Sequence, residues 1–283
     1  MEFRGPLGVV FSGGGSHGAW QAGVSKAFAE AGLKFAKVQG SSIGSISGVA
    51  YALGEVEKAI EFWSDIDSLK IMRFAPKLRP FSLFDGRPLY DALWYIKDED
   101  ATRAKLQCEL TVVALCRDDN RYHYARFTPE GKTGWDGPLV GKLVASCSVP
   151  NVFPPVRLQI DGKERTLVDG AVLGAEMPSY KAVFGCADVI VVSLVRPEDI
   201  GGFQPLKRLR GDPLGRDLVQ AAEGLRRSPG SPRVFTLFPS EPIPYGAFTF
   251  RSRECAAAVA HGLRDGRAFL GSAESYLGVT SLG

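Results

Sequence analysis

Two glycine-rich turns, each between a short apolar stretch and an amphipathic one, constrain this chain more than any other feature of its sequence. The first turn follows residues 7–11 and has the sequence Gly13-Gly14-Gly15-Ser16-His17-Gly18. The second follows residues 35–39 and has the sequence Gly40-Ser41-Ser42-Ile43-Gly44. A glycine-rich turn that opens a helix offers free backbone N–H groups, and Gly-Xaa-Ser-Xaa-Gly presents a serine hydroxyl between a strand and a helix. Together the two turns predict an oxyanion hole beside a serine nucleophile.

The flanking sequences predict a strand–turn–helix unit around each turn. Residues 7–11 are apolar and follow Gly5-Pro6, as in a short buried strand. The stretches after both turns place apolar side chains on one helical face, and small residues such as Gly44 and Gly48 are interleaved in the second stretch. Small residues let a helix approach a sheet closely, as a sharp elbow requires. Ser42 is therefore predicted at the elbow.

A dinucleotide site is the alternative interpretation of the first turn. Gly13, Gly15 and Gly18 match the fingerprint in which backbone N–H groups hold a pyrophosphate. That site needs a carboxylate at the end of the second strand, about 20 positions on, to hold the ribose. Residues 35–39 have the sequence Phe-Ala-Lys-Val-Gln and supply none. The sequence therefore disfavours a nucleotide.

A serine nucleophile needs a base, and the chain has only three histidines, His17, His123 and His261. Each has a context typical of a surface or structural residue, although His17 lies in the predicted oxyanion loop and is kept as a weaker base candidate. Asp169 is the stronger candidate because Asp169-Gly170 forms a predicted turn after a strand-like run at residues 165–168. An Asp-Gly turn alone is ordinarily structural.

Four blocks in order resemble the patatin-like phospholipases, acyl hydrolases that use a Ser-Asp dyad. The first two blocks are the glycine turns. The third is residues 145–155, with the sequence Ala-Ser-Cys-Ser-Val-Pro-Asn-Val-Phe-Pro-Pro, and the fourth is Asp169-Gly170-Ala171. The resemblance extends over residues 7–195 and is looser beyond them. One position departs from the family pattern: the fifth residue of the glycine loop is usually basic, most often arginine, and here it is His17. A neutral imidazole is a weaker electrostatic aid to an oxyanion than a permanent cation.

The resemblance implies a role for each matched residue. Ser42 would attack an ester carbonyl, and Asp169 would accept its proton. Metal and organic cofactors are not implied. Lipid or other acyl esters are the implied substrates, and two alternatives stay open: a thioesterase or acyltransferase using the same dyad, and a non-catalytic lipid-binding module. The elbow would be shaped by Gly40 and Gly44, and the oxyanion hole would comprise Gly13, Gly14, Gly15, Ser16, His17 and Gly18.

The remaining sequence favours one large α/β domain over residues 1–283, because 45% of the residues are hydrophobic and no composition break divides the chain. Strand-like runs alternate with helical patterns, which predicts a three-layer α/β/α sandwich with a mainly parallel central sheet. The predicted strands beyond the elbow cover residues 110–116, 121–127, 156–160, 165–168, 189–195 and 234–238, and the last helix covers residues 255–270.

Location and partners are constrained by weaker signals. The first strand begins within six residues of the start, which predicts no signal peptide, and no apolar run reaches the roughly 18 residues of a spanning helix. Five scattered cysteines suit reduced thiols in the cytoplasm. A net charge of +3 is too small to indicate nucleic acid. Nothing in the sequence identifies a protein partner.

Two segments are candidates for covering the site. Residues 70–87 carry five basic side chains against one acidic, interleaved with aromatic ones. This composition suits peripheral contact with an anionic membrane, although packing of the phenylalanines on the domain is slightly favoured. Pro76 and Pro80 exclude a long helix here. The segment belongs to a predicted cap or membrane-facing region at residues 64–105, and residues 197–233 are predicted to be a mobile loop.

Overall fold

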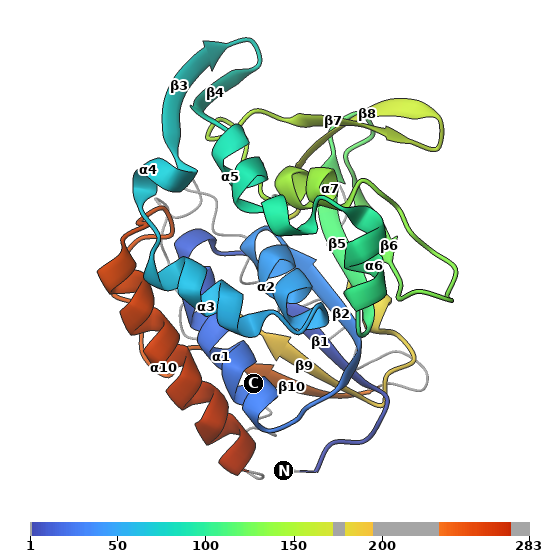
Figure 1. Ribbon diagram of the computed structural model, residues 1–283, viewed down its shortest axis with the longest axis vertical. Coiled ribbons are helices and arrows are strands. Elements are labelled where there is room, and N and C mark those ends of the chain that lie inside the picture. Colours follow the sequence, from blue (N-terminus) through green and yellow to red (C-terminus); the bar gives the residue numbers. More distant parts are fainter. Residues whose placement is uncertain (1, 172–178, 195–231, 273–283) are drawn as a thin grey trace, which may run out of the picture.

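The sheet at the centre of the fold is mainly parallel, as predicted (Figure 1). The computed structural model describes residues 2–171, 179–194 and 232–272. Its parallel part has the order β10-β9-β1-β2-β5, in which the first elements of the chain lie at the centre. The bounds are β1 (Leu7–Phe11), β2 (Phe35–Ser41), β5 (Glu109–Cys116), β9 (Asp188–Val192) and β10 (Arg233–Leu237).

Antiparallel strands complete the other end of the sheet. They are β6 (Arg121–Phe127), β7 (Val156–Ile160) and β8 (Lys163–Asp169). One edge of β5 is paired with β6 from residue 110 to residue 116. The opposite edge is shared, because β2 pairs with residues 109–113 of β5 and β8 pairs with residues 114–116. The carboxyl ends of β2 and β8 therefore meet at the middle of β5.

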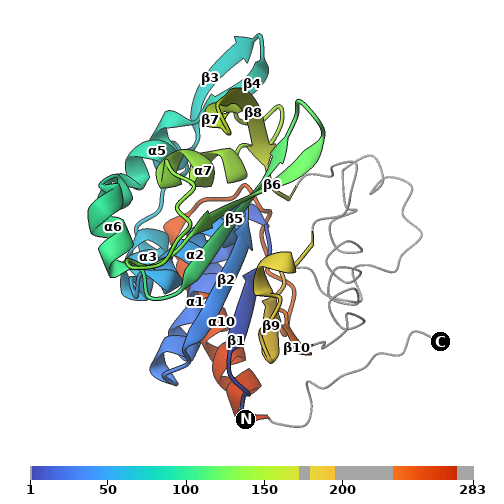
Figure 2. The same cartoon turned by 90° about the vertical axis from the view of Figure 1, so that its right-hand side faces the viewer.

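Successive side chains of β1 point to opposite faces of the sheet and belong to two separate hydrophobic cores. Val9 and Phe11 belong to the large core on one face, whereas Val10 belongs to a smaller core on the other. Figure 2 shows helices covering the larger face, and η3 packs against β1 and β2 on the second face. The helices are α1 (Gly18–Glu30), α2 (Ile43–Ala52), α3 (Val56–Ser64), α7 (Leu139–Ser146) and α10 (Ser252–Gly271), and η3 is Lys181–Val183.

Helices α1 and α10 approach so closely that only glycine fits where their backbones meet. A Cβ at Gly23 would overlap the carbonyl oxygen of Val259, and one at Gly262 would overlap that of Trp20. The contact also includes a buried hydrogen bond of 2.7 Å from Trp20 Nε1 to Asp265 Oδ2. This contact fixes the helix that follows the first glycine turn.

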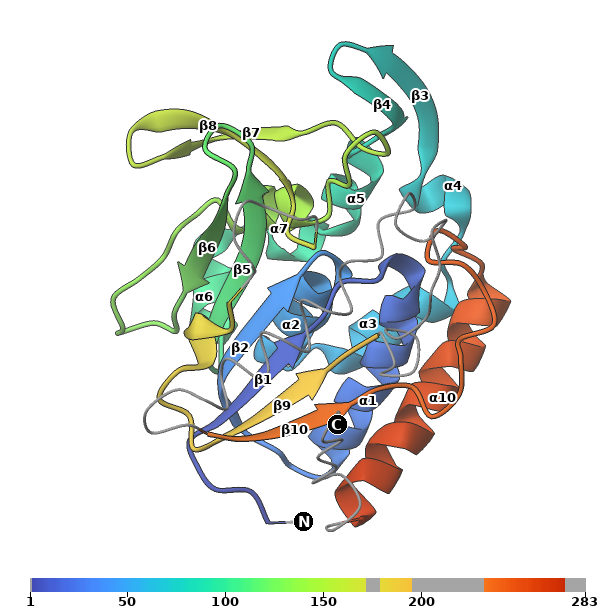
Figure 3. The ribbon, with the colours of Figure 1, turned by 180° about the vertical axis from the view of Figure 1, so that it is seen from behind.

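A peripheral region between α3 and β5 carries a two-stranded hairpin that projects from one end of the fold (Figure 3). The two prolines, Pro76 and Pro80, lie in and beside this hairpin, so the long helix is absent as predicted. The elements of the region are α4 (Ser68–Ile71), β3 (Arg73–Leu78), β4 (Phe81–Asp85), α5 (Arg87–Ala92), η2 (Trp94–Ile96) and α6 (Glu99–Lys105).

Most predicted strands agree with the structure to within two residues, and two predictions need correction. The strand predicted at 189–195 ends earlier, at Val192. Asp169, predicted to begin a turn, is the last residue of β8 and is still paired with Ala114. The prediction of a mobile loop at residues 197–233 lies outside the described residues, except that Arg233 begins β10.

Candidate active site

Ser42 lies at a sharp turn between β2 and α2. Its backbone has φ 52° and ψ −133°, a region that a residue with a side chain rarely adopts. The neighbouring glycines make the turn possible, because a Cβ at Gly40 would overlap Gly44 and one at Gly44 would overlap the carbonyl oxygen of Phe11. The predicted elbow is therefore present in the geometry, and both of its glycines are sterically required.

Asp169 lies against the elbow because β2 and β8 end beside one another on β5. Ser42 Oγ donates a hydrogen bond of 2.6 Å to Asp169 Oδ2, and the backbone N–H of Ala171 donates to Oδ1 at 2.7 Å. Asp169 is 1% exposed. Burial raises the pKa of Asp169 to about 7, although the bonds from Ser42 and Ala171 lower it. The carboxyl group is a base of near-neutral strength.

Residues 145–155 connect the elbow to Asp169. Ser146 Oγ accepts a hydrogen bond of 2.9 Å from the N–H of Ser42 and donates one of 2.6 Å to the carbonyl oxygen of Val113. The carbonyl oxygen of Ser148 accepts from the N–H of Asp169 at 3.0 Å. The sequence motif indicated this segment but gave Ser146 no role. In the structure, the Ser146 hydroxyl links the backbone N–H of Ser42 to the backbone carbonyl of Val113.

The glycine loop contributes two residues, Gly14 and Gly15, to the cavity in front of Ser42. In the described part of the chain, their N–H groups donate to no acceptor. The N–H of Ser16 donates to Ala247 at 2.7 Å, and that of His17 donates to Gly14 at 3.3 Å. Of the predicted oxyanion-hole residues, only Gly14 and Gly15 therefore combine a place in the cavity wall with an available N–H.

Gly13 and Gly18 provide close packing around the same loop. A Cβ at Gly13 would lie 3.1 Å from the Cβ of Ser42, and one at Gly18 would overlap the side chain of Ile43. The sequence analysis assigned both glycines to the predicted oxyanion hole, whereas in the structure they pack against Ser42 and Ile43 of the elbow. Their contacts indicate that they set the distance between the loop and the elbow.

His17 anchors the loop and does not contact Ser42. Its Nε2 donates a hydrogen bond of 2.6 Å to the carbonyl oxygen of Tyr245. Burial lowers the pKa of His17, although the bond to Tyr245 raises it, and the net lowering favours the neutral imidazole at neutral pH. This geometry disfavours His17 as the general base. His123 and His261 lie elsewhere, with Nε2 atoms 3.0 Å from Lys142 Nζ and from Ser240 Oγ, respectively.

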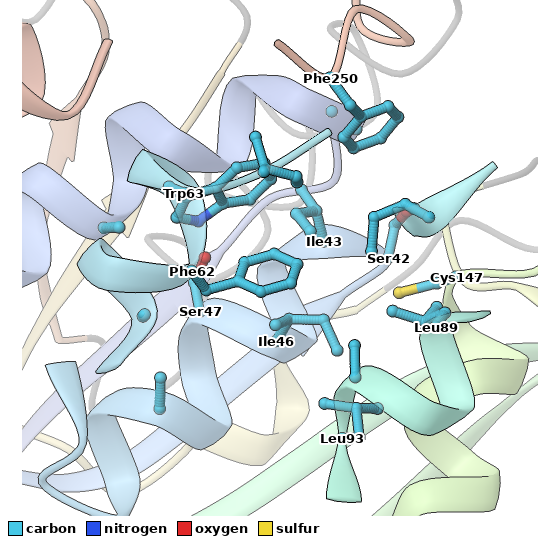
Figure 4. Close-up of a pocket in the computed structure, with 18 of the residues that line it drawn as sticks. Ser42, Ile43, Ile46, Ser47, Phe62, Trp63, Leu89, Leu93, Cys147 and Phe250 are labelled. Atoms are coloured by element: carbon cyan, nitrogen blue, oxygen red, sulfur yellow. The ribbon is translucent and has the colours of Figure 1, made fainter. Parts of the chain in front are cut away.

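An apolar cavity of about 580 Å³ opens in front of Ser42 and extends between α2, α3 and α5 (Figure 4). Asp169 and Cys147 also line it, and burial together with the Asp169 charge raises the pKa of the Cys147 thiol well above its usual range. That thiol is protonated at neutral pH. Labelled side chains of the wall are Ile43, Ile46, Phe62, Trp63, Leu89, Leu93 and Phe250.

Asp169 and Cys147 are the only His, Cys, Asp or Glu side chains among the described residues that line this cavity. Within those ranges, no three His, Cys, Asp or Glu side chains are grouped so that they could hold a metal ion. The five cysteines are all unpaired. None of the described helices has the length and apolar character needed to cross a membrane.

A strained serine elbow, a buried carboxylate and a mainly parallel sheet place this chain among α/β proteins with a candidate serine hydrolase site. The family model for patatin-like phospholipases matches residues 9–178, which is more than half of the 283-residue chain. The chain belongs to the patatin-like phospholipase family.

Two curated proteins are similar to part of this chain. The uncharacterised protein YqhO of Bacillus subtilis is 28% identical over 190 residues, a match that covers 58% of this chain and 62% of YqhO. The uncharacterised NTE family protein Rv1063c of Mycobacterium tuberculosis is 25% identical over 170 residues, covering 59% of this chain and 43% of the relative. The chain thus matches less than two thirds of either relative.

Among solved structures, VipD from Legionella pneumophila has a similar fold. The TM-score is 0.50 at 14% sequence identity, and the match covers 95% of this chain and 67% of VipD. At this identity the similarity shows a shared fold.

Proposed function

We propose that this chain is a lipid acyl hydrolase in which Ser42 is the nucleophile and Asp169 is the general base. The observation that carries the proposal is the 2.6 Å hydrogen bond from Ser42 Oγ to the buried Asp169 Oδ2 at the wall of an apolar cavity. Membership of the patatin-like phospholipase family supports the same class of reaction. The apolar wall favours an acyl chain as the bound part of the substrate.

The proposed first step forms an acyl-enzyme. Ser42 Oγ attacks the ester carbonyl carbon while Asp169 Oδ2 takes the hydroxyl proton. The tetrahedral intermediate then collapses, and the proton passes from Asp169 to the departing alcohol. An exposed aspartate has a pKa near 4 and is a poor base at neutral pH. A pKa of about 7 makes the same carboxylate far better suited to this transfer.

Gly14 and Gly15 would stabilise the oxyanion of this intermediate. Both residues line the cavity that contains Ser42, and in the described part of the chain their N–H groups donate to no acceptor. Loss of one such donor typically costs about 2.7 to 4 kcal/mol of transition-state stabilisation. Because the neutral imidazole of His17 is favoured and is bonded to Tyr245, the backbone carries this role in our proposal.

The second step releases the acid. Asp169 takes a proton from a water molecule, whose oxygen attacks the acyl carbonyl. The proton then returns to Ser42 Oγ as the ester bond to serine breaks. The residues already described are sufficient for both steps.

Covalent labelling with a fluorophosphonate ester tests the proposal. We expect one label per wild-type molecule by intact mass, none on Ser42→Ala, and strongly reduced labelling of Asp169→Asn. Ser25→Ala is the matched control, because Ser25 lines the same cavity and its buried hydroxyl has no hydrogen-bond partner in the described part of the chain. A folded wild type that takes no label would overturn the hydrolase and favour a lipid-binding module.

Release of acid identifies the substrate. Phospholipid vesicles, p-nitrophenyl butyrate and an acyl thioester offer the same acyl chemistry with different leaving groups. We expect turnover of lipid ester to exceed that of thioester. The opposite preference would assign the same dyad to a thioesterase or an acyltransferase. The predicted cytoplasmic location and single-domain organisation stay predictions.

A further inference from the structure

The β3–β4 hairpin presents large apolar side chains to water. Leu78 and Phe81 are paired across its tip and are 88% and 50% exposed, and Phe74 is 68% exposed. The prediction that the phenylalanines of this segment pack on the domain is therefore wrong for Phe74 and Phe81. Large apolar side chains gathered on one projecting element mark an interaction surface.

Hydrogen bonds hold the base of the hairpin. Asp85 at its base is buried and accepts hydrogen bonds from the guanidinium groups of Arg73 and Arg87. Burial raises the pKa of Asp85, but the bonds from Arg87 and Arg73 outweigh it and lower the pKa to about 2. The N–H of Phe84 also donates to the carbonyl oxygen of Val152 at 2.9 Å. The exposed tip therefore extends from a base that several hydrogen bonds hold in place.

Two cations flank the apolar tip. Lys77 and Arg79 are exposed, and in the described part of the chain neither has an ion-pair partner. Residues 73–87 contain four basic side chains and one acidic one, a net charge of +3. Apolar side chains with adjacent unpaired cations match an anionic lipid interface, where both are stabilised.

The hairpin is continuous with the wall of the cavity. The ring centroids of Phe74 and Phe84 are 6.0 Å apart, and those of Phe84 and Phe153 are 6.2 Å apart. Phe153 lines the cavity. The residues that precede and follow the hairpin, Ile71 and Leu89, line it too. A bilayer at the hairpin would therefore adjoin the cavity that contains Ser42.

We propose that the β3–β4 hairpin docks this protein on an anionic phospholipid surface. Leu78 and Phe81 insert among the headgroups, and Lys77 and Arg79 contact the lipid anions. The benefit of docking rests on the proposed function, because it brings lipid esters to the cavity. Docking itself is measured by binding alone, so each claim can fail without the other.

Co-sedimentation with vesicles tests the docking. The parent protein carries Ser42→Ala, so that no lipid is hydrolysed, and the vesicles contain phosphatidylcholine with or without 30 mol% phosphatidylserine, a composition of about one anion in three lipids. We expect Leu78→Ser/Phe81→Ser to weaken binding to the anionic vesicles at least about tenfold. Lys77→Gln/Arg79→Gln is expected to weaken it by about fivefold per cation and to remove the preference for phosphatidylserine.

Matched variants at the other end of the strands control for composition. Phe184→Ser removes an aromatic side chain that is 47% exposed, and Lys34→Gln/Arg264→Gln removes two exposed cations. Both are expected to bind as the parent does. Circular dichroism and thermal melting verify the fold of each variant. When Ser42 is intact, the hairpin variants are expected to hydrolyse p-nitrophenyl butyrate at the wild-type rate.

Three outcomes would overturn the docking proposal. Binding by the hairpin variants at the parent level would remove the hairpin from the interface. Equal binding of the parent to neutral and anionic vesicles would remove the role of the cations. A dimer that dissociates on Leu78→Ser/Phe81→Ser, seen by analytical ultracentrifugation, would assign the surface to a second copy of the chain. Intact vesicle binding without any esterase activity would instead overturn the proposed function alone.

Discussion

The elbow around Ser42 and the β3–β4 hairpin use their side chains in opposite ways. At the elbow, Ser42, Ser146 and Asp169 are buried and hydrogen-bonded to one another or to the backbone. At the hairpin tip, Leu78 and Phe81 are exposed. The elbow fixes a geometry, and its substitutions should affect stability and chemistry together. The hairpin tip adds little to the fold, and its substitutions should affect contact with a partner.

The largest effect is expected at Ser42. Both Ser42→Gly and Ser42→Ala should lower hydrolysis by about 10⁴-fold or more, because the nucleophile is lost. Glycine adopts a φ of 52° and a ψ of −133° without strain, whereas alanine, like serine, is strained there, so Ser42→Gly should be more stable than Ser42→Ala by about 1 kcal/mol. Chemical denaturation measures this difference. Equal stability of the two variants would contradict a strained elbow.

Asp169→Asn should alter how stability depends on pH. The ordinary pKa of 3.8 applies in the unfolded chain, and the folded value is about 7, so the native protein retains a proton that the unfolded chain loses between these values. Wild-type stability should therefore fall, relative to Asp169→Asn, as pH rises from 4 to 8, by as much as about 4 kcal/mol. Urea denaturation across this range measures the difference. Parallel pH dependences would show that burial does not raise this pKa.

Adding one methyl group, by a glycine-to-alanine substitution, should lower the free energy of unfolding far more at the elbow than at the hairpin. Gly44→Ala would place a Cβ against the carbonyl oxygen of Phe11 and should lower the free energy of unfolding by about 3 kcal/mol. Gly86→Ala at the base of the hairpin is the control, because its Cβ would have no neighbour closer than 4.0 Å. Thermal melting compares the two variants. If both lost the same stability, the elbow would not be the more tightly packed region.

The smallest effect is expected at the hairpin tip. Leu78→Ser/Phe81→Ser should change the free energy of unfolding by less than about 0.5 kcal/mol, since exposed side chains stabilise the fold little. Phe84→Ser should cost about 2 kcal/mol, because its ring packs between Phe74 and Phe153. Denaturation of both variants gives the comparison. A large loss at the tip would indicate a structural role for residues 78 and 81.

The parts of the site that the sequence could predict depend on local patterns. Ser42 and its glycines lie within a single pentapeptide, whose strand–turn–helix context has a clear apolar periodicity. The proximity of Asp169 to Ser42 was expected only from the order of family motifs. Its physical cause is the pairing of β2 and β8 with one edge of β5, which a local pattern does not contain.

The parts that could not be predicted depend on distant contacts. His17 was placed in the oxyanion loop by position, but its side chain bonds to Tyr245, which is 228 residues away. Ser146 gave no local signal for its bond to the N–H of Ser42. For the hairpin, composition suited membrane contact, but packing of the phenylalanines on the domain was favoured because Pro76 and Pro80 exclude a long amphipathic helix. The register of β3 with β4 instead leaves Phe74 and Phe81 exposed.

The pH dependence of fluorophosphonate labelling tests most directly whether Asp169 activates Ser42. The account predicts that the labelling rate of the wild type rises about tenfold per pH unit below an inflection near pH 7 and then levels off, since only the carboxylate accepts the proton. Asp169→Asn should label slowly and show no such inflection. Labelling of Asp169→Asn at the wild-type rate, with an unchanged pH profile, would contradict the account.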